Sequence, residues 1–207
     1  MQINCISHGL VQSNIYIVSN NGQAVVIDCG CKPDDILAVA EEKGLDLKFV
    51  ILTHGHFDHF YYVDDLRQKA NVQAFIHKQD AACFTDPYAS GLALFPVRGN
   101  IDFKPADRLL QDGDIIECGG LEFRIIHTPG HSKGSICIHV GDALFTGDTL
   151  FRNSIGRTDL PGGSMAEITS AIREKLFCLP EETVVYPGHG PRSTIGYEKK
   201  HNPYLQR

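Results

Sequence analysis

The sequence predicts two similar α/β halves that pack sheet against sheet, with helices on the outside. Short apolar runs of β-type residues alternate with helical patterns and glycine-rich turns, which is typical of a mixed α/β domain. This scheme occurs once over about residues 1–105 and again over about residues 106–207. No low-complexity segment or long linker divides the 207 residues, so we expect a single domain over residues 1–207.

In the first half, two apolar runs flank Asn20-Asn21-Gly22, a sequence that favours a β-hairpin turn. Ile36, Val39 and Ala40 share one helical face, and Gly44 marks the end of that helix. The glycines and prolines of residues 86–105 predict a surface loop. The expected strands are residues 15–18, 24–28, 49–52 and 72–76, and the expected helices are residues 34–43 and about 60–70.

The second half repeats the pattern. Gly119-Gly120 and Gly141-Asp142 each separate two apolar runs, as hairpin turns do. Ile168, Ile172 and Leu176 are spaced for one face of an amphipathic helix. The expected strands are residues 114–117, 121–126, 135–140, 143–146 and 183–186, and the expected helix is residues 165–177.

The composition argues against several classes of protein. The formal net charge of −6 and the pI of about 5.9 leave no basic footprint for nucleic acid. No stretch reaches the roughly 18 apolar residues of a membrane span, and the first residues do not resemble a signal peptide. Seven cysteines without a Cys-x-x-Cys pair predict reduced thiols in a cytoplasmic protein. The composition does not indicate an oligomeric state.

Four polar clusters each follow directly after an apolar run. They are residues 53–59, 127–131, 147–148 and 187–190. Ligand sites in α/β sheets gather outside the carboxyl ends of the strands, so we expect all four clusters to line one crevice. Four of the six residues in the sequence H-G-H-F-D-H, residues 54–59, are histidine or aspartate. This density is far more typical of a metal site than of ordinary loop residues.

The polar clusters contain imidazole and carboxylate side chains, which suit borderline divalent metals. The candidate metal ligands are His54, His56, Asp58, His59, His131, Asp148 and His189. His54 and His56 lie two positions apart in a turn, so both side chains can converge on one ion. His131 is then the third imidazole of that ion.

A second ion can be held by the remaining ligands. Asp58 and His59 stand at the start of the next predicted helix, and His189 can complete their site. Asp148 is the natural bridge, because a carboxylate has an oxygen for each metal. The plain alternatives are a turn-forming role for Asp148 and an ordinary loop position for His189.

The motif of residues 54–59 resembles the signature of the metallo-β-lactamase superfamily. His131, Asp148 and His189 match the remaining metal positions of that family in order and context, and the resemblance covers nearly the whole chain. It implies the αββα sandwich, with two mixed sheets enclosed by outer helices. It also implies two divalent ions, one held by His54, His56 and His131 and the other by Asp58, His59 and His189, with Asp148 shared. Zinc is the expected metal, and iron or manganese would also be compatible.

Within this superfamily, the chain is most similar to glyoxalase II-like hydrolases. Residues 128–132 (TPGHS) and 144–151 (LFTGDTLF) resemble that branch, and residues 155–159 (IGRTD) resemble both its short members and persulfide dioxygenases. Classical members have a lysine at the Arg157 position and a tyrosine at the Asp159 position. Classical members also carry a C-terminal helical domain that contacts glutathione, and we expect no such domain in this chain.

The resemblance implies hydrolysis of a small thioester or ester by a water that two metal ions share. Asp58 would orient that water and take its proton, and Arg157 would anchor a substrate carboxylate. An ion pair of Arg157 with Asp159 is the plain alternative for this arginine. Antibiotic hydrolysis is not favoured, because class B1 β-lactamases have a cysteine where this chain has Asp148.

Three other functions remain open from the sequence. The first is a mononuclear iron persulfide dioxygenase, which would use His54, His56 or His131, and Asp148, because iron oxygenases use two histidines and a carboxylate. The second is a hydrolase of other small esters or lactones. The third is a metal-binding module without turnover.

Overall fold

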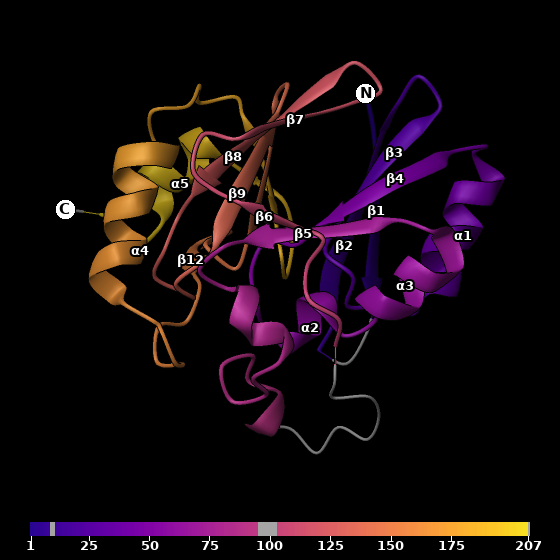
Figure 1. The fold of residues 1–207 in the computed structure, drawn as a ribbon. Coiled ribbons are helices and arrows are strands. Elements are labelled where there is room, and N and C mark those ends of the chain that lie inside the picture. Colours follow the sequence, from indigo (N-terminus) through magenta and orange to yellow (C-terminus); the bar gives the residue numbers. More distant parts are fainter. Residues whose placement is uncertain (9–10, 95–102, 207) are drawn as a thin grey trace.

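Among residues 1–8, 11–94 and 103–206, which the computed structural model describes, two six-stranded β-sheets form the centre of the molecule (Figure 1). Helices α1 (Pro33–Glu42) and α3 (Val63–Ala70) cover the first sheet. Helices α4 (Met165–Ala171) and α5 (Ile195–His201) lie on the opposite side, against the second sheet. This arrangement confirms the predicted αββα sandwich.

The first sheet takes its strands in chain order, from β1 to β6. They are β1 (Gln2–His8), β2 (Ser13–Asn20), β3 (Gln23–Ile27), β4 (Asp46–Ile51), β5 (Gln73–His77) and β6 (Arg108–Leu110). The pairs β1–β2 and β2–β3 are antiparallel, whereas β3 to β6 run parallel. The carboxyl ends of the parallel strands therefore meet at one edge. Strand β6 belongs to this first sheet although it lies after residue 105, in the part of the chain that we expected to form the second half.

The second sheet has the order β14-β13-β10-β9-β8-β7. Its strands are β7 (Ile115–Cys118), β8 (Leu121–His127), β9 (Ile136–Val140), β10 (Ala143–Gly147), β13 (Val184–Pro187) and β14 (Ser193–Thr194). Strands β10 and β13 are parallel, and the other pairs are antiparallel. A small separate hairpin joins β11 (Leu150–Phe151) to β12 (Ser154–Ile155).

The predicted hairpins and helices have local causes that the structure bears out. Asn21 and Gly22 have φ values of 50° and 76°, as the two central residues of a type I′ turn require. Helix α1 begins with a proline in its first turn, followed by Asp34 and Asp35, which favour a helix N-terminus. Helix α4 continues into the π-helical turn η3 (Ile172–Leu176), so the predicted helix over residues 165–177 is confirmed.

The apolar core lies in three layers, and the central layer joins the two sheets. Tyr16 of β2 meets Phe145 of β10 across this layer, with ring centroids 5.1 Å apart, and Phe123 of β8 is fully buried in it. On the other face of β2, Ile15 and Ile17 pack among the residues under the first pair of helices. Both faces of the strand are buried, which explains its continuous apolar sequence.

The predicted surface loop over residues 86–105 is wrong for part of its length. Ser90 and Phe103 are buried, and the Ser90 carbonyl accepts a hydrogen bond from the Phe57 amide at 3.0 Å. This bond ties the segment to the histidine-rich motif, an attachment that glycine and proline content cannot indicate. Residues 95–102 lie outside the described residues.

Several short elements were not expected from the sequence. Strand β1 lies at a sheet edge with several of its residues exposed, so it lacks the apolar run of a buried strand. Helix α5 is short and contains Gly196, which weakens a helical pattern. The other short helices are α2 (Phe57–Phe60), η1 (Ala81–Phe84) and η2 (Leu92–Leu94). No helix in the described part of the chain is both long and apolar enough to span a membrane.

Two histidines join the sheets beside the central layer. His77 ends β5 and His127 ends β8, and their rings stack with centroids 4.1 Å apart and planes 13° apart. Burial, His127 and Lys78 lower the pKa of His77 from 6.5 to about 4, and this outweighs the opposing effect of Asp112 and Asp114. The folded protein therefore favours the neutral imidazole at this position.

We expect His77 to make the protein less stable in mild acid. Between pH 6.5 and about 4, the unfolded chain binds a proton at His77 that the folded chain does not, so stability falls as the pH falls. Thermal unfolding of chelator-treated protein at a series of pH values should show a larger loss for the wild type than for His77→Gln. Equal losses in the two proteins over this window would contradict the expectation.

Candidate metal centre

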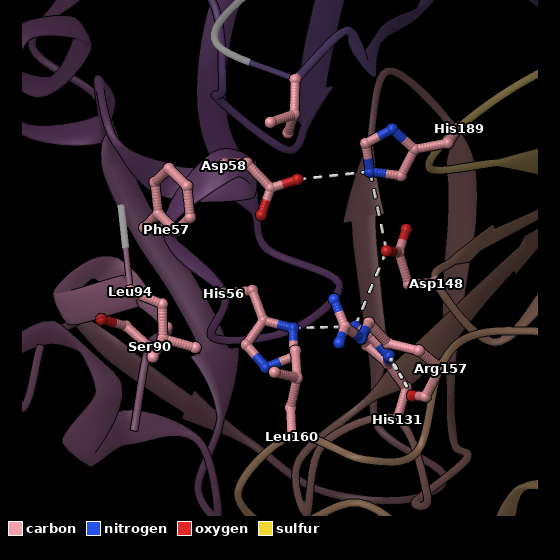
Figure 2. Close-up of a pocket in the computed structure, with 12 residues that line it drawn as sticks. His56, Phe57, Asp58, Ser90, Leu94, His131, Asp148, Arg157, Leu160 and His189 are labelled. Carbon is pink, nitrogen blue, oxygen red and sulfur yellow. Dashed lines mark hydrogen bonds and ion pairs between the residues drawn. The ribbon is translucent and has the colours of Figure 1, made fainter. Parts of the chain in front are cut away.

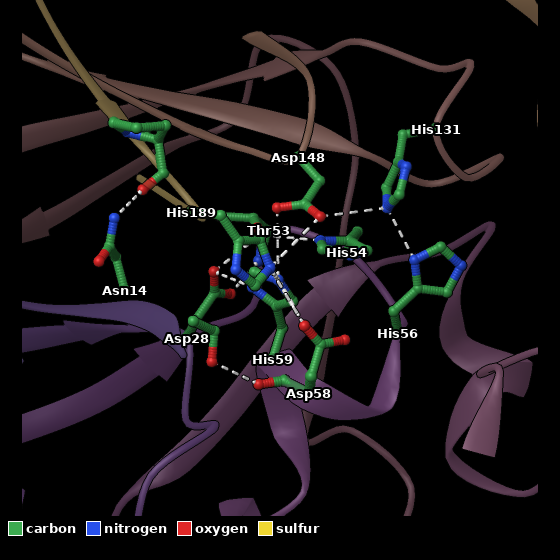
Figure 3. A network of polar contacts seen from close by, with 12 residues as sticks. Asn14, Asp28, Thr53, His54, His56, Asp58, His59, His131, Asp148 and His189 are labelled. Atoms are coloured by element: carbon green, nitrogen blue, oxygen red, sulfur yellow. Dashed lines mark hydrogen bonds and ion pairs between the residues drawn. The ribbon is translucent and has the colours of Figure 1, made fainter. Parts of the chain in front are cut away.

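All seven candidate ligands come together at the edge where strands of both sheets end (Figure 3). They arrive on four loops. His54 and His56 follow β4, with Asp58 and His59 directly after them in α2. His131 lies between β8 and β9, Asp148 follows β10 and His189 follows β13. The crevice that the sequence predicts is thus built from the four polar clusters.

The first group of ligand atoms belongs to His54, His56 and His131. One ring nitrogen from each lies within 4.8 Å of the others, and Nδ1 of His56 is 2.7 Å from Nε2 of His131. All three side chains are buried. Three imidazole nitrogens at such separations can coordinate one divalent ion.

The second group belongs to Asp58, His59 and His189. Oδ2 of Asp58 lies 3.3 Å from Nε2 of His59 and 3.2 Å from Nε2 of His189. The two imidazole nitrogens are themselves 3.3 Å apart. Two nitrogens and one carboxylate oxygen therefore lie close enough to share one ion.

Asp148 lies between the two groups. Its Oδ2 is 3.6 Å from Nε2 of His131 and 3.6 Å from Nε2 of His189. Its Oδ1 is 3.4 Å from Nε2 of His59. The carboxylate thus contacts members of both groups, which is the position that a shared ligand needs.

Buried atoms without hydrogen bonds show that this donor set fits a metal. Nε2 of His54 and Oδ1 of Asp148 are among the buried side-chain atoms of the described residues that have no hydrogen-bond partner. Leaving such atoms unpaired costs about 1–3 kcal/mol each. A cation at the cluster would satisfy them, and the imidazole and carboxylate donors suit zinc, iron or manganese.

His54 and His56 favour the neutral imidazole, and Asp58 and Asp148 favour the ionised carboxylate. Burial lowers the pKa of His54 well below its usual value, and burial together with His131 lowers the pKa of His56 to about 3. Burial alone would raise the pKa of Asp58 and Asp148, but His59 and His189, joined by His131 at Asp148, together outweigh it and hold both carboxyls below their ordinary pKa. Neutral imidazole and ionised carboxylate are the forms that bind metals.

His59 shows how strongly the site attracts positive charge. Burial lowers its pKa, but the carboxylates of Asp58, Asp28 and Asp148 outweigh burial and raise the pKa well above 6.5. A proton on this imidazole balances the surrounding negative charge. A divalent ion would provide the same balance with more charge, so metal binding should displace this proton.

Hydrogen bonds behind two of the ligands, His59 and His131, fix which ring nitrogen faces the cluster. Asp28 accepts bonds from the amide and the hydroxyl of Thr53 at 2.8 and 2.9 Å, and contacts Nδ1 of His59 at 2.8 Å. Nδ1 of His131 donates to the carbonyl of Arg157 at 2.8 Å. In both histidines Nε2 is left for the cluster, as outer partners of metal-binding histidines arrange it.

Asp28 is a site residue that the sequence analysis missed. Its φ of 63° lies in the left-handed region, which aspartate tolerates better than most residues but which still costs energy. Strain of this kind is concentrated at functional sites. The available signal was an acidic residue directly after a buried strand, the same signal that identifies Asp148.

Backbone packing closes the cluster on one side. A Cβ atom placed on Gly188 would lie 2.3 Å from Oδ1 of Asp148 and 2.8 Å from Cε1 of His59. No side chain fits in this space. The glycine before His189 is therefore required for the backbone to approach the two ligands this closely.

A cavity of about 360 Å³ opens above the cluster (Figure 2). Phe57, Leu94 and Leu160 provide apolar walls, with Ser90 and Arg157 as polar groups. The Arg157 guanidinium forms two hydrogen bonds with Asp159, at 2.7 and 2.8 Å. This ion pair is largely exposed. The structure thus contains the Arg157–Asp159 ion pair that we gave as the alternative to substrate binding, and Arg157 also lines the cavity.

Two adjoining groups of histidine and aspartate side chains on an αββα sandwich, beneath a cavity, are typical of a metal-binding protein. The family model described as the metallo-beta-lactamase superfamily matches residues 8–189. The chain therefore belongs to the metallo-β-lactamase superfamily.

Individual relatives agree with this assignment. "Probable metallo-hydrolase YqgX" of Bacillus subtilis is 36% identical over 200 residues, covering 95% of this chain and 94% of that protein. "Hydroxyacylglutathione hydrolase GloC" of Haemophilus influenzae is 35% identical over 209 residues, covering 99% of this chain and 98% of that one. The crystal structure of the BLEG-1 B3 metallo-beta-lactamase is similar with a TM-score of 0.93 and 36% identity, covering 100% of both chains.

We expect metal addition to raise the thermal stability of the protein. A ligand present at about 1,000 times its Kd stabilises the native state by about 4 kcal/mol, which corresponds to a Tm increase on the order of 10 °C for a chain of this size. Thermal unfolding of chelator-treated protein with and without added Zn²⁺ measures this shift. The double variant His131→Ala/His189→Ala, which removes one imidazole from each group, should lose most of it. An equal shift in the variant would place the bound metal elsewhere.

Proposed function

We propose that this protein is a glyoxalase II-like thioesterase, a metal-dependent hydrolase of hydroxyacyl-thiol thioesters. The observation that carries the proposal is the pair of ligand groups that meet at Asp148 beneath a cavity. The proposed ligands are His54, His56 and His131 for the first ion, Asp58, His59 and His189 for the second, and Asp148 for both. Zn²⁺ is the proposed metal, because imidazole and carboxylate are among its usual ligands.

The reaction divides between the ions and the residues of the cavity. Bound divalent ions would supply an activated water and stabilise negative charge on the carbonyl oxygen. Asp58 lines the cavity and is held ionised, so its carboxylate can orient a water and accept its proton. A thiol leaving group has a pKa near about 8.5, so a thioester needs little assistance from a protein acid.

Two further observations support a small thioester as substrate. The apolar walls of the cavity suit the carbon skeleton of a small acyl-thiol, and Ser90 and Arg157 offer polar contacts. A relative that is 35% identical along nearly its whole length bears the name hydroxyacylglutathione hydrolase. The free cysteines of the structure are typical of a reducing compartment, and we propose a cytoplasmic location.

A second candidate function has a specific observation in its favour. His56, His131 and Asp148 all line the cavity, and two histidines with one carboxylate are the ligand set of mononuclear iron oxygenases. A persulfide dioxygenase would hold one iron with His54, His56 or His131, and Asp148. Hydrolysis of other small esters or lactones would use the same centre as thioester hydrolysis.

We expect zinc-loaded protein to hydrolyse S-D-lactoylglutathione, and Asp58→Ala to reduce kcat by about 10²–10⁴-fold because it removes the proton acceptor. Asp142→Ala is the matched control, since this carboxylate is exposed in the turn between β9 and β10. The measurement is release of free thiol, with metal content determined for every variant.

Other outcomes would redirect the assignment. Metal-loaded protein that leaves the thioester intact would rule out the glutathione thioesterase. Oxygen uptake by iron-loaded protein with glutathione persulfide would then support the dioxygenase. Turnover of small esters or lactones would support the wider hydrolase. A chromogenic cephalosporin belongs in the same panel, because one similar structure is a β-lactamase.

We propose that Arg157 binds a substrate carboxylate, which replaces Asp159 as the partner of the guanidinium. A charge-assisted hydrogen bond contributes about 1.5 kcal/mol, so Arg157→Ala should raise KM for a carboxylate-bearing thioester about tenfold with kcat little changed. A thioester of an uncharged thiol is the control substrate and should be unaffected. Equal effects on both substrates would show instead that the ion pair only braces the loop.

A further inference from the structure

Asp80 is a buried carboxylate beneath the metal centre that the reaction does not use. It follows β5 and is 2% exposed. Its Oδ2 accepts hydrogen bonds from the Gly55 amide at 2.8 Å and the Ser132 hydroxyl at 2.6 Å. Its Oδ1 accepts a bond from the Gly134 amide at 2.6 Å. A buried charge with this many donors is well satisfied.

The donors to Asp80 come from the two loops that carry the first group of ligands. Gly55 stands between His54 and His56, and Ser132 directly follows His131. One loop belongs to the first sheet and the other to the second. A single carboxylate therefore links both loops. The residues that it binds are the immediate sequence neighbours of the three histidines.

Each hydrogen bond between Asp80, Ser132 and Ser135 has a defined donor. The Ser132 hydroxyl has one proton and gives it to Asp80, so its contact with the Ser135 hydroxyl at 2.7 Å must be donated by Ser135. The Ser135 oxygen in turn accepts the Ser132 amide at 3.0 Å. The two serines thus orient each other and point the Ser132 proton at the carboxylate.

The link leaves little room for movement. A Cβ atom on Gly134 would lie 2.6 Å from Cγ of Asp80, and one on Gly55 would lie 2.6 Å from Sγ of Cys83. Both loops pass too close to the segment after β5 to carry side chains at these positions. A shift of either loop would therefore break hydrogen bonds or create clashes, so the separation of the loops is strongly constrained.

The second group of ligands has a different carboxylate behind it. Asp28 contacts His59 directly and holds Thr53. In the described part of the chain, Asp80 forms no hydrogen bond with His59 or Thr53. Asp28 also reaches the first group, because the Thr53 hydroxyl that it holds lies 3.1 Å from Nδ1 of His54. The hydrogen bonds of Asp80, in contrast, reach only the loops of the first group.

We propose that Asp80 is a positioning residue for the first metal ion. Asp80 holds His56 and His131 at binding distance before the metal arrives. The proposal rests on the ligand assignment proposed above and is independent of the substrate. Outer partners of metal ligands affect metal affinity by roughly 10–100-fold. The effect should be confined to the site of His54, His56 and His131.

The test is Co²⁺ affinity, measured by absorption in backgrounds that each retain one site. His189→Ala leaves the first site, and His56→Ala leaves the second. Adding Asp80→Asn, which replaces an acceptor oxygen with a donor, should weaken Co²⁺ binding about 10–100-fold in the His189→Ala background. In the His56→Ala background the change should be less than about twofold, well below that range.

Asp107→Asn is the matched control. Asp107 also accepts a backbone amide bond, from Ala74 at 2.7 Å, but it pairs with Arg67, away from the metal loops. It should change neither affinity. Ser132→Ala removes one donor while keeping Asp80, and should weaken only the first site, by a smaller factor. This variant decides the question if Asp80→Asn does not fold. Equal weakening of both sites, or of neither, would overturn the proposal, whether or not the protein hydrolyses thioesters.

Discussion

The apolar interface between the two sheets is the interaction on which the metal centre depends. His56 and His131 lie 75 positions apart in the chain, yet their ring nitrogens approach to 2.7 Å. Each histidine is carried by a loop of a different sheet, so their separation follows from how the sheets pack. Burying a large apolar side chain contributes about 1.5–3 kcal/mol, and residues such as Tyr16, Phe123 and Phe145 are buried in this interface. The apolar core therefore stabilises the position of the polar site.

The polar site adds constraints of its own, because its charges are removed from water. Asp28, Asp80 and Asp148 are carboxylates packed among histidines and backbone amides. A buried charge is tolerated only when hydrogen bonds or opposite charges compensate it. Asp28 and Asp80 obtain this compensation from the protein, whereas Asp148 retains a buried oxygen without a hydrogen bond. The difference separates residues that shape the centre from one that is available to a metal.

Much of the fold followed from local patterns. Apolar runs, Asn21-Gly22 and the paired glycines identified strands and hairpins, and helical spacing identified α1 and α4, because these signals lie within a few neighbouring residues. Edge strand β1 and the short helix α5 have weak local signals and were missed. The surface-loop prediction for residues 86–105 was wrong at Ser90, which is buried and bonded through its carbonyl to the amide of Phe57, a residue distant in the chain.

For the candidate site, the chain order of histidines and aspartates by itself determined which side chains could serve as ligands, since H-G-H-F-D-H and the three later positions are dense in metal-binding groups. Only the tertiary structure showed that these side chains come within reach of one another and which residues stand behind them. Asp28 and Asp80 act through contacts with residues 25 to 54 positions away. Such contacts depend on the packing of two sheets, and no local pattern of side chains records them.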